Sequence, residues 1–224
     1  MLLHFLDSIR KIKILLSDKD YSLFNYDSYE DYKATQIFHN KRKIDRVWSD
    51  TRTLERVKSA CISDTQVLGL CHGTRNGYEL SFFNKWDANF LCIGTDISET
   101  ALNYENSYVW DFHKIKLEWI NKFDFVYSNS LDHSYDPSLA LTTWLNQIKN
   151  TGQVIIELTK NHGVAYQSKM DPFGIKPQYF PFLVTSYFGD QITVSHTVDK
   201  KSNMDVDSFL FFIKKNVASV RKIV

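Results

Sequence analysis

Paired cysteines are missing from this sequence of 224 residues. The chain has three cysteines, Cys61, Cys71 and Cys92, and no CxxC pair. Small disulfide-stapled folds and cysteine-ligated zinc sites both need cysteines in pairs. The cysteine pattern therefore argues against both, and it predicts a protein of the reducing cytoplasm.

An excess of one charge is missing as well. The chain has 27 Lys and Arg against 26 Asp and Glu, so its formal net charge is +1. Proteins that bind nucleic acid or anionic membranes usually carry a clear basic excess. Nucleic acid is therefore not an expected partner.

The sequence also lacks an apolar run long enough to cross a bilayer. The most apolar end, residues 1–16, is interrupted by charged side chains, and no small-residue cleavage site of a signal peptide follows it. Its apolar residues, from Leu2 to Leu16, fall at helical spacing. This pattern predicts a helix packed on the domain, with a helix lying on a membrane surface as the alternative.

Glycine is scarce, at 8 residues, and the dinucleotide fingerprint GxGxxG is absent. Glycines do occur in the turn CHGTRNG, residues 71–77, which follows the apolar run Val67–Leu70 and precedes a possible helix. A tight turn between strand and helix presents backbone N–H groups to an anionic or nucleotide ligand. We therefore expect the ligand site at this turn.

Short apolar segments alternate with helical patterns from residue 65 onward. Strands are expected at Thr65–Leu70, Asn89–Gly94, Ser107–Trp110, Phe123–Ser128 and Gln153–Leu158. Helices are expected at Gly77–Lys85, Ser98–Asn106, Ser138–Lys149 (ended by Asn150-Thr151-Gly152) and near Gln178–Phe188. The alternation predicts parallel βαβ units with helices on both faces of the sheet.

The two ends of the chain differ from this pattern. Gln191–Val198 and Ser208–Lys215 are expected strands whose polar link is too short for a crossover helix, so they should pair antiparallel. The predicted fold is an α/β, three-layer Rossmann-like sheet, mostly parallel and closed by a C-terminal antiparallel hairpin. Residues 1–60 show helical patterns without a strand, which predicts an N-terminal helical cap (1–60) and a ligand-binding domain (61–224).

Acidic residues follow two of the expected strands. Ligands of open parallel sheets bind beyond the carboxyl ends of the strands. Asp96 comes about 20 residues after Gly73, the separation at which an acid accepts hydrogen bonds from ribose hydroxyls. Asp111, after the third strand, is a second acid, suited to an adenine amino group. The two acids predict a nucleoside site at this edge.

Five segments occur in a fixed order between Thr65 and Leu158: VLGLCHGTRNG, GTDIS, WDFH, FDFVYSNSLDHSYDP and TGQVIIEL. Together they resemble the class I S-adenosylmethionine (SAM)-dependent methyltransferases, nearest the small-molecule enzymes with an LEHVxDP-like motif after strand four. The resemblance implies a SAM site. It assigns Cys71, His72 and Gly73 to the methionine part of the cofactor, with Thr74 and Arg75 in the same turn. Asp96 would bind the ribose, and Ile97, Asp111 and Phe112 would contact the adenine. Asn129 and Ser130 would close the pocket below strand four.

The chain departs from this family at three positions. Gly69 stands where an acid is usual, and Cys71 and Arg75 stand where glycine is usual. The Arg75 side chain would either clash with the cofactor or bind its carboxylate through the guanidinium. The basic cluster Asn40-Lys41-Arg42-Lys43 is read either as a solvated helix face or as a lid that meets an anionic group.

His133 and Asp132 are the candidate catalytic residues, because both follow strand four on the side of the expected methyl donor. Methyl transfer needs alignment and, for some acceptors, a base, which histidine supplies near neutral pH. A hydrogen-bonded structural histidine is the alternative for His133. No metal site is predicted, although Asp132, His133 and Asp136 offer metal-ligand groups.

The sequence thus predicts an enzyme that transfers a methyl group from SAM to a small-molecule acceptor, leaving S-adenosylhomocysteine. The alternative is a non-catalytic SAM-binding or assembly module with the same fold. A nicotinamide-dependent oxidoreductase is disfavoured by the missing glycine fingerprint. Neither the acceptor nor the oligomeric state is indicated by any pattern in the chain.

Overall fold

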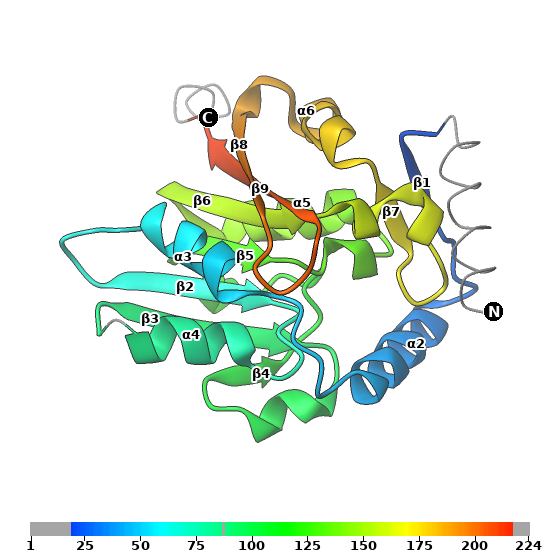
Figure 1. The fold of residues 1–224 in the computed structure, drawn as a ribbon, viewed down its shortest axis with the longest axis horizontal. Helices are drawn as coiled ribbons and strands as arrows, with labels where there is room; N and C mark the ends of the chain where they lie inside the picture. Colours follow the sequence, from blue (N-terminus) through cyan, green and yellow to red (C-terminus); the bar gives the residue numbers. More distant parts are fainter. Residues whose placement is uncertain (1–18, 87, 217–224) are drawn as a thin grey trace.

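A seven-stranded sheet forms the centre of the computed structural model, which describes residues 19–86 and 88–216. The helix predicted over residues 1–16 lies outside this range. The strand order is β4-β3-β2-β5-β6-β9-β8 (Figure 1). The strands are β2 (Val67–His72), β3 (Phe90–Asp96), β4 (Ser107–Val109), β5 (Phe123–Ser128), β6 (Ile148–Leu158), β8 (Ile192–Lys200) and β9 (Asp207–Lys215).

The strand directions confirm the predicted topology. β4, β3, β2, β5 and β6 run parallel, whereas β9 pairs antiparallel with β6 and β8 pairs antiparallel with β9. The C-terminal hairpin therefore closes a mostly parallel sheet. No helix among the described residues has the length and apolar character needed to span a membrane.

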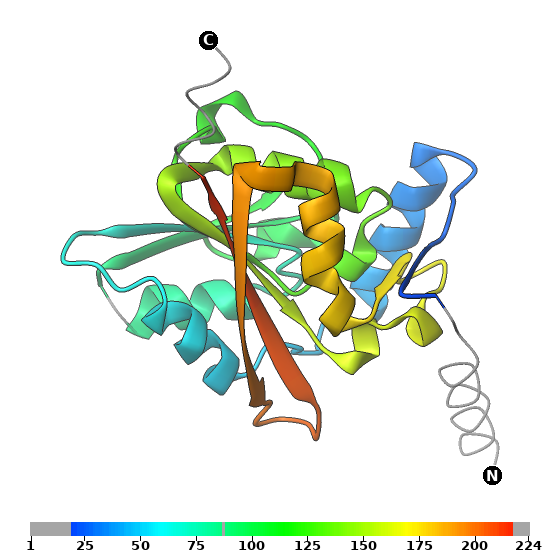
Figure 2. The same cartoon turned by 90° about the horizontal axis from the view of Figure 1, so that it is seen from above.

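Successive side chains of β2 point to opposite faces of the sheet and pack in two separate cores. Val67 and Cys71 face a core shared with α3 (Thr51–Ser59) and α4 (Tyr78–Trp86). Leu70 faces the opposite core, shared with α5 (Pro137–Gln147) and α6 (Phe180–Phe188). The helices thus cover both sheet faces and give the predicted three layers (Figure 2).

Two predicted helix boundaries are wrong. The segment predicted as a helix over Ser98–Asn106 is a short 3-10 helix, η1 (Glu99–Asn103), with Ser98 as its N-cap. Helix α5 stops at Gln147, before the Asn150-Thr151-Gly152 signal, and β6 begins at Ile148 and runs through Gly152. Ile148 is fully buried and pairs with Phe123 of β5, so this long-range pairing overrides the local helix-end signal.

The N-terminal residues also differ from prediction. The short strand β1 (Tyr21–Leu23) pairs antiparallel with β7 (Phe173–Ile175), so residues 1–60 do contain a strand. Its pairing partner β7 lies more than half the chain length away in the sequence, and no local pattern predicts the pairing. Helices α2 (Tyr29–Arg42) and α3 follow, capped by the side chains of Ser28 and Asp50.

Helix α2 packs on the domain through a polar face. Gln36, His39 and Asn40 are buried, while the aromatic side chain of Phe38 is 57% exposed. The inward face of this helix is therefore largely polar. The predicted basic cluster lies at the end of α2, where Lys41 forms an ion pair with Glu99.

Candidate functional site

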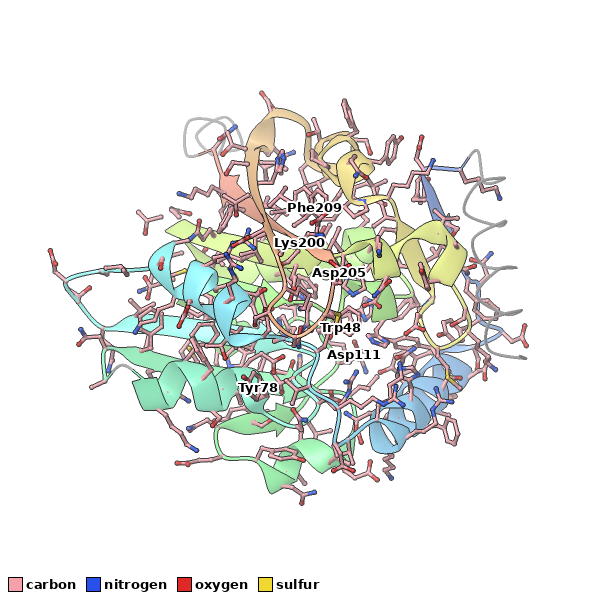
Figure 3. All side chains as sticks on the ribbon, viewed as in Figure 1. Trp48, Tyr78, Asp111, Lys200, Asp205 and Phe209 are labelled. Atoms are coloured by element: carbon pink, nitrogen blue, oxygen red, sulfur yellow. The ribbon has the colours of Figure 1, made fainter. Side chains whose placement is uncertain are left out.

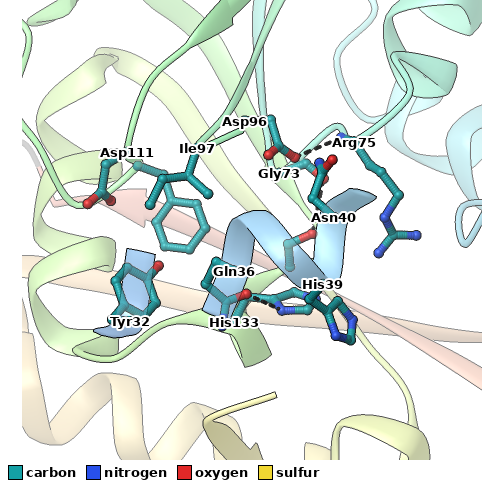
Figure 4. A pocket seen from close by; sticks show the side chains of 12 residues that line it. Tyr32, Gln36, His39, Asn40, Gly73, Arg75, Asp96, Ile97, Asp111 and His133 are labelled. Carbon is teal, nitrogen blue, oxygen red and sulfur yellow. Dashed lines mark hydrogen bonds between the residues drawn. The ribbon is translucent and has the colours of Figure 1, made fainter. Parts of the chain in front are cut away.

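A cavity opens at the carboxyl ends of β2, β3 and β5, where the strand order reverses between β2 and β5. This is the position at which ligands bind in sheets of this kind. Six predicted residues form the strand-end side of the cavity: Gly73, Asp96, Ile97, Asp111, Phe112 and Ser130. Four residues form its α2 face: Tyr32, Gln36, His39 and Asn40 (Figure 4). Arg75 and His133 complete the lining.

The turn after β2 is built as the sequence suggested. Gly73 has φ 72°, and its N–H donates to the Thr95 carbonyl at 2.8 Å. A Cβ at this position would lie 2.5 Å from Cβ of Ser130, so only glycine fits between β2 and the segment after β5.

Arg75 occupies the turn without filling the cavity with its side chain. Its backbone has φ 48°, a left-handed conformation that glycine adopts more easily, which accounts for the glycine usual at this place. Its backbone N–H donates to Asp96 Oδ2 at 3.1 Å, and its guanidinium donates to the Arg46 carbonyl at 3.3 Å. The guanidinium is thus held beside the segment that follows α2.

Asp96 is a buried carboxylate at the end of β3. Each of its oxygens accepts one backbone N–H, from Ser98 at 3.0 Å and from Arg75 at 3.1 Å. Burial raises the pKa of this carboxyl. Since each carboxylate oxygen has two lone pairs, both retain capacity for a further donor from the cavity.

The carboxylate of Asp111 has more hydrogen-bond contacts than that of Asp96. Oδ1 accepts from the backbone N–H of His113 at 2.9 Å and lies 2.7 Å from His113 Nδ1, while Oδ2 accepts from the Tyr29 hydroxyl at 2.9 Å. Burial alone would raise the pKa of Asp111, but the hydrogen bonds and charge of His113 outweigh it, and the pKa is lowered. Tyr29 belongs to α2, so this acid also connects the helix to the strand ends.

Four predicted cofactor residues have side chains outside the cavity. Cys71 packs in the core beside α4, and Thr74 is buried with its N–H on the Thr95 carbonyl. His72 contacts Thr95 Oγ1 and Gln147 Oε1 at 2.7 and 2.8 Å and stacks on Trp144, and burial lowers its pKa to about 4. The Asn129 amide donates to Ser49 Oγ at 2.7 Å. None of these four residues is among the lining residues of the cavity.

His133 lies on the side of the cavity away from Asp111 (Figure 4), whereas the other predicted catalytic residue, Asp132, is not among the lining residues. His133 Nδ1 is 3.0 Å from two acceptors, Gln36 Oε1 and the Met170 carbonyl, so this nitrogen carries a proton. His133 Nε2 lies 4.0 Å from Asp132 Oδ1, an oxygen with no hydrogen-bond partner among the described residues. Asp136 instead caps α5 through Leu139 N–H.

His39, on α2, is the most unusual side chain of the site. It is 2% exposed, and neither ring nitrogen makes a hydrogen bond within residues 19–86 and 88–216. Burial first, then the charges of His133 and Lys43, lower its pKa to about 3, so the ring is neutral. Its ring centroid is 5.1 Å from that of His133.

Three residues of the α2 face, Tyr32, Gln36 and His39, are not among the predicted site residues, and Asn40 was named only as part of the basic cluster. These four residues follow one another at intervals of four, three and one, which places them on one side of a helix. Polar residues at helical spacing are therefore the signal that could have indicated this face, although helices usually bury apolar ones.

A second hollow lies between the segment around residues 160–166 and the β8–β9 hairpin, with a volume of about 300 Å³. Lys200, Asp205 and Phe209 are among its lining residues (Figure 3). Lys200 forms ion pairs with Asp205 and Asp207 at 3.4 and 3.1 Å. None of its described lining residues belongs to the predicted site.

Solved structures share the fold of this chain. A 1,6-didemethyltoxoflavin-N1-methyltransferase of Burkholderia thailandensis, with bound 1,6-didemethyltoxoflavin and S-adenosylhomocysteine, aligns at TM-score 0.64 and 10% identity, over 90% of this chain and 97% of that one. The chain has a methyltransferase fold. The plantazolicin methyltransferase BpumL, in complex with a triazolic substrate analog and S-adenosylhomocysteine, aligns at TM-score 0.61 and 15% identity, over 84% and 98%.

A SAM-dependent methyltransferase of Aquifex aeolicus aligns at TM-score 0.57 and 16% identity, over 77% of this chain and 97% of that one. At identities this low, the likeness establishes the fold alone. No protein-family model and no curated protein matches the sequence. The substrate must therefore be argued from the site itself.

Proposed function

We propose that this protein is a SAM-dependent methyltransferase that acts on a small molecule in the cytoplasm. The observation that carries the proposal is the pair of buried carboxylates, Asp96 and Asp111, at successive strand ends of a methyltransferase fold around one cavity. The free cysteines Cys61, Cys71 and Cys92 support the reducing compartment.

The donor and acceptor groups on the strand-end side suit the cofactor. Asp96 keeps unused lone pairs for the two hydroxyls of a ribose, and Asp111 offers a carboxylate to an amino group at the adenine edge. Gly73 leaves room for close approach of the cofactor to the backbone. In this proposal Ile97 and Phe112 pack on the adenine, and Ser130 closes the pocket below β5.

Room in the cavity is set by α2. The cavity volume is about 40 Å³, within about 450 Å³ of empty space between the lining atoms and outward toward solvent. Small-molecule sites usually enclose about 300–1,000 Å³. We therefore propose that α2 is the part of the predicted N-terminal cap (1–60) that moves outward to admit the cofactor and then covers it, while α3 stays packed in the core beside α4.

When bound, SAM supplies an electrophilic methyl group. The chain's own contribution is to align the acceptor and to exclude water, because transfer in line with a leaving sulfur depends on orientation. His133 lies on the cavity opposite Asp111, and we propose that its Nε2 takes the proton of the acceptor. The carboxylate of Asp132, with Oδ1 4.0 Å from Nε2, then stabilises the positive charge of the ring. The acceptor is then bound between His133, His39 and the cofactor.

A non-catalytic SAM-binding module is the second candidate. The small cavity favours it, since a cap that opens only far enough to admit the cofactor would leave no room for an acceptor. The two candidates differ in turnover but not in cofactor binding.

Calorimetric titration with SAM, S-adenosylhomocysteine and NAD tests the cofactor first. Saturable binding of the first two, without binding of NAD, is expected; absence of binding to either sulfur compound contradicts the proposal. Incubation with methyl-labelled SAM and a library of small acceptors then separates the candidates. Labelled product and S-adenosylhomocysteine in equal amounts are expected from the enzyme, whereas binding with no label transferred across the library favours the module.

A further inference from the structure

Three metal-ligating side chains from distant parts of the chain meet beside the cavity. One ligand atom each from His39, His133 and Asp171 lies within 4.8 Å of the other two. Asp171 Oδ1 is shared between them, 3.7 Å from His39 Nε2 and 3.9 Å from His133 Nδ1. No metal pattern exists in the sequence, because the ligands come from α2, the segment after β5 and the loop before β7.

The two spacings that involve Asp171 are close to those around a bound metal, whereas the ligand nitrogens of the two histidines lie within 4.8 Å of each other and must also approach. Zinc bonds of about 2.0–2.2 Å in a tetrahedron place neighbouring ligand atoms about 3.4 Å apart. The two contacts of Asp171 must therefore shorten by only a few tenths of an ångström. Asp171 is half-buried in a loop, so small shifts of its side chain are sterically easy.

His39 gives the second, independent indication of a ligand. Its buried ring has no hydrogen-bond partner on either nitrogen among the described residues. Leaving a buried polar group unsatisfied costs about 1–3 kcal/mol. A metal ion at Nε2 would satisfy the atom that faces Asp171.

Asp132 supplies the partner that a metal-bound His133 needs. Metal-ligating histidines usually donate their second N–H to a carboxylate or a carbonyl. If His133 binds metal through Nδ1, it gives up its contacts with Gln36 Oε1 and the Met170 carbonyl. Its proton moves to Nε2, which lies 4.0 Å from the unpartnered Oδ1 of Asp132. Asp132 is then a positioning residue that acts through His133.

We propose that His39, His133 and Asp171 bind a divalent first-row transition-metal ion, with Zn²⁺ the best match to two imidazoles and one carboxylate. Three protein ligands leave a fourth position open, as in catalytic zinc sites. His39 and His133 both line the cavity, so the open position faces the acceptor side. Lys43 and Arg75 also act electrostatically on His39, so Asp171 and Asp132 must balance these cations as well as the metal.

The metal also narrows the class of acceptor, an inference that rests on the proposed function. An acceptor with a hydroxyl or ring nitrogen would bind the open position as the fourth ligand. The metal lowers the pKa of such a group, which loses its proton to solvent and becomes the nucleophile. His133 would then act as a ligand and no longer as the base.

Zn²⁺ titration into chelator-treated full-length protein, without SAM, tests the site directly. One equivalent should bind, and Co²⁺ in its place should give the visible absorption of nitrogen-ligated cobalt. His39→Ala and Asp171→Asn should each weaken Zn²⁺ binding by about 100-fold, and Asp132→Asn by about 10–100-fold. His196→Ala removes an exposed histidine of β8 and should change nothing.

Two results would overturn the metal site: no stoichiometric binding, or binding that survives both His39→Ala and Asp171→Asn. Asp171→Asn keeps the test decisive if loss of the buried His39 harms folding. SAM is titrated separately, so SAM binding without Zn²⁺ binding refutes the metal site alone. Zn²⁺ binding without SAM binding leaves the site standing and refutes the proposed function.

Discussion

The two sides of the cavity are held in place by different means. On the strand-end side, Asp96 and Asp111 accept backbone N–H groups from residues two positions further along the chain. The α2 face is held by side-chain contacts to distant segments, including Tyr29 to Asp111, Gln36 to Met170 and Lys41 to Glu99. The strand-end side is therefore held by local backbone contacts, whereas α2, the helix proposed above to move, is joined to it through side chains.

The largest effect is expected on the α2 face, from Tyr32→Ala. Tyr32 is buried against the rings of Tyr26, Tyr135 and His113, at centroid distances of 5.3, 4.6 and 5.7 Å. Loss of a buried aromatic ring costs about 3–5 kcal/mol of unfolding free energy. Urea denaturation measures the loss. Phe38→Ala, on the exposed side of the same helix, should cost less than about 1 kcal/mol. Equal losses for the two variants would show that α2 is not docked through this face.

On the strand-end side, Asp96→Ala should weaken SAM binding by about 10–100-fold. Hydrogen bonds to a charged group contribute about 1.5–3 kcal/mol, and the ribose would lose its acceptor. Calorimetry measures the affinity, with thermal unfolding as a check on the fold. Asp205→Ala removes a carboxylate that is 98% exposed and serves as the control. Unchanged affinity in Asp96→Ala would mean that the ribose is bound elsewhere.

Gly73→Ala tests how tightly the strand-end side is built. The new Cβ would meet Ser130 at 2.5 Å, and overpacking of this kind costs about 1–3 kcal/mol. Gly189→Ala is a matched control, because Gly189 also has positive φ, 57°, but no atom within 4 Å of its added Cβ. Gly73→Ala should therefore destabilise more than Gly189→Ala and also weaken SAM binding. Equal losses would mean that the backbone conformation alone requires glycine.

The smallest effect is expected from Asp111, which joins the two sides. Its pKa is lower in the folded protein than in the unfolded chain, so its contribution to stability is complete above the unfolded pKa of about 3.9. That contribution falls as the pH drops through the folded pKa. Melting temperatures measured from pH 6 to pH 3 should decline less in Asp111→Asn than in the wild type. Parallel curves would show that Asp111 does not carry this dependence.

The sequence placed Asp96 and Asp111 at one edge of the sheet for a physical reason. The carboxyl ends of parallel strands meet at one edge, so residues that follow apolar runs, such as Asp96 and Asp111, come together whatever the details of packing. The same argument placed Cys71 and His72 near the site but could not tell which way each side chain points. In β2, Cys71 faces one core, and His72 is enclosed by Thr95, Gln147 and Trp144.

The α2 face could not be predicted in this way. His39 and Asp171 meet only because α2 and the loop before β7 fold against the same strand ends, and nothing in either segment indicates the other. The pairing of β1 with β7 was missed for the same reason. When two distant segments share no periodic pattern, a single sequence does not predict the contacts between them.

A crystal structure with S-adenosylhomocysteine tests the central claim most directly. We expect the ribose hydroxyls on Asp96, the adenine edge at Asp111 and Phe112, the amino-acid end at the turn of Gly73, and α2 displaced outward to admit them. A ligand bound away from the ends of β2 and β3, or the same ligand seated with neither carboxylate in contact, would contradict the account.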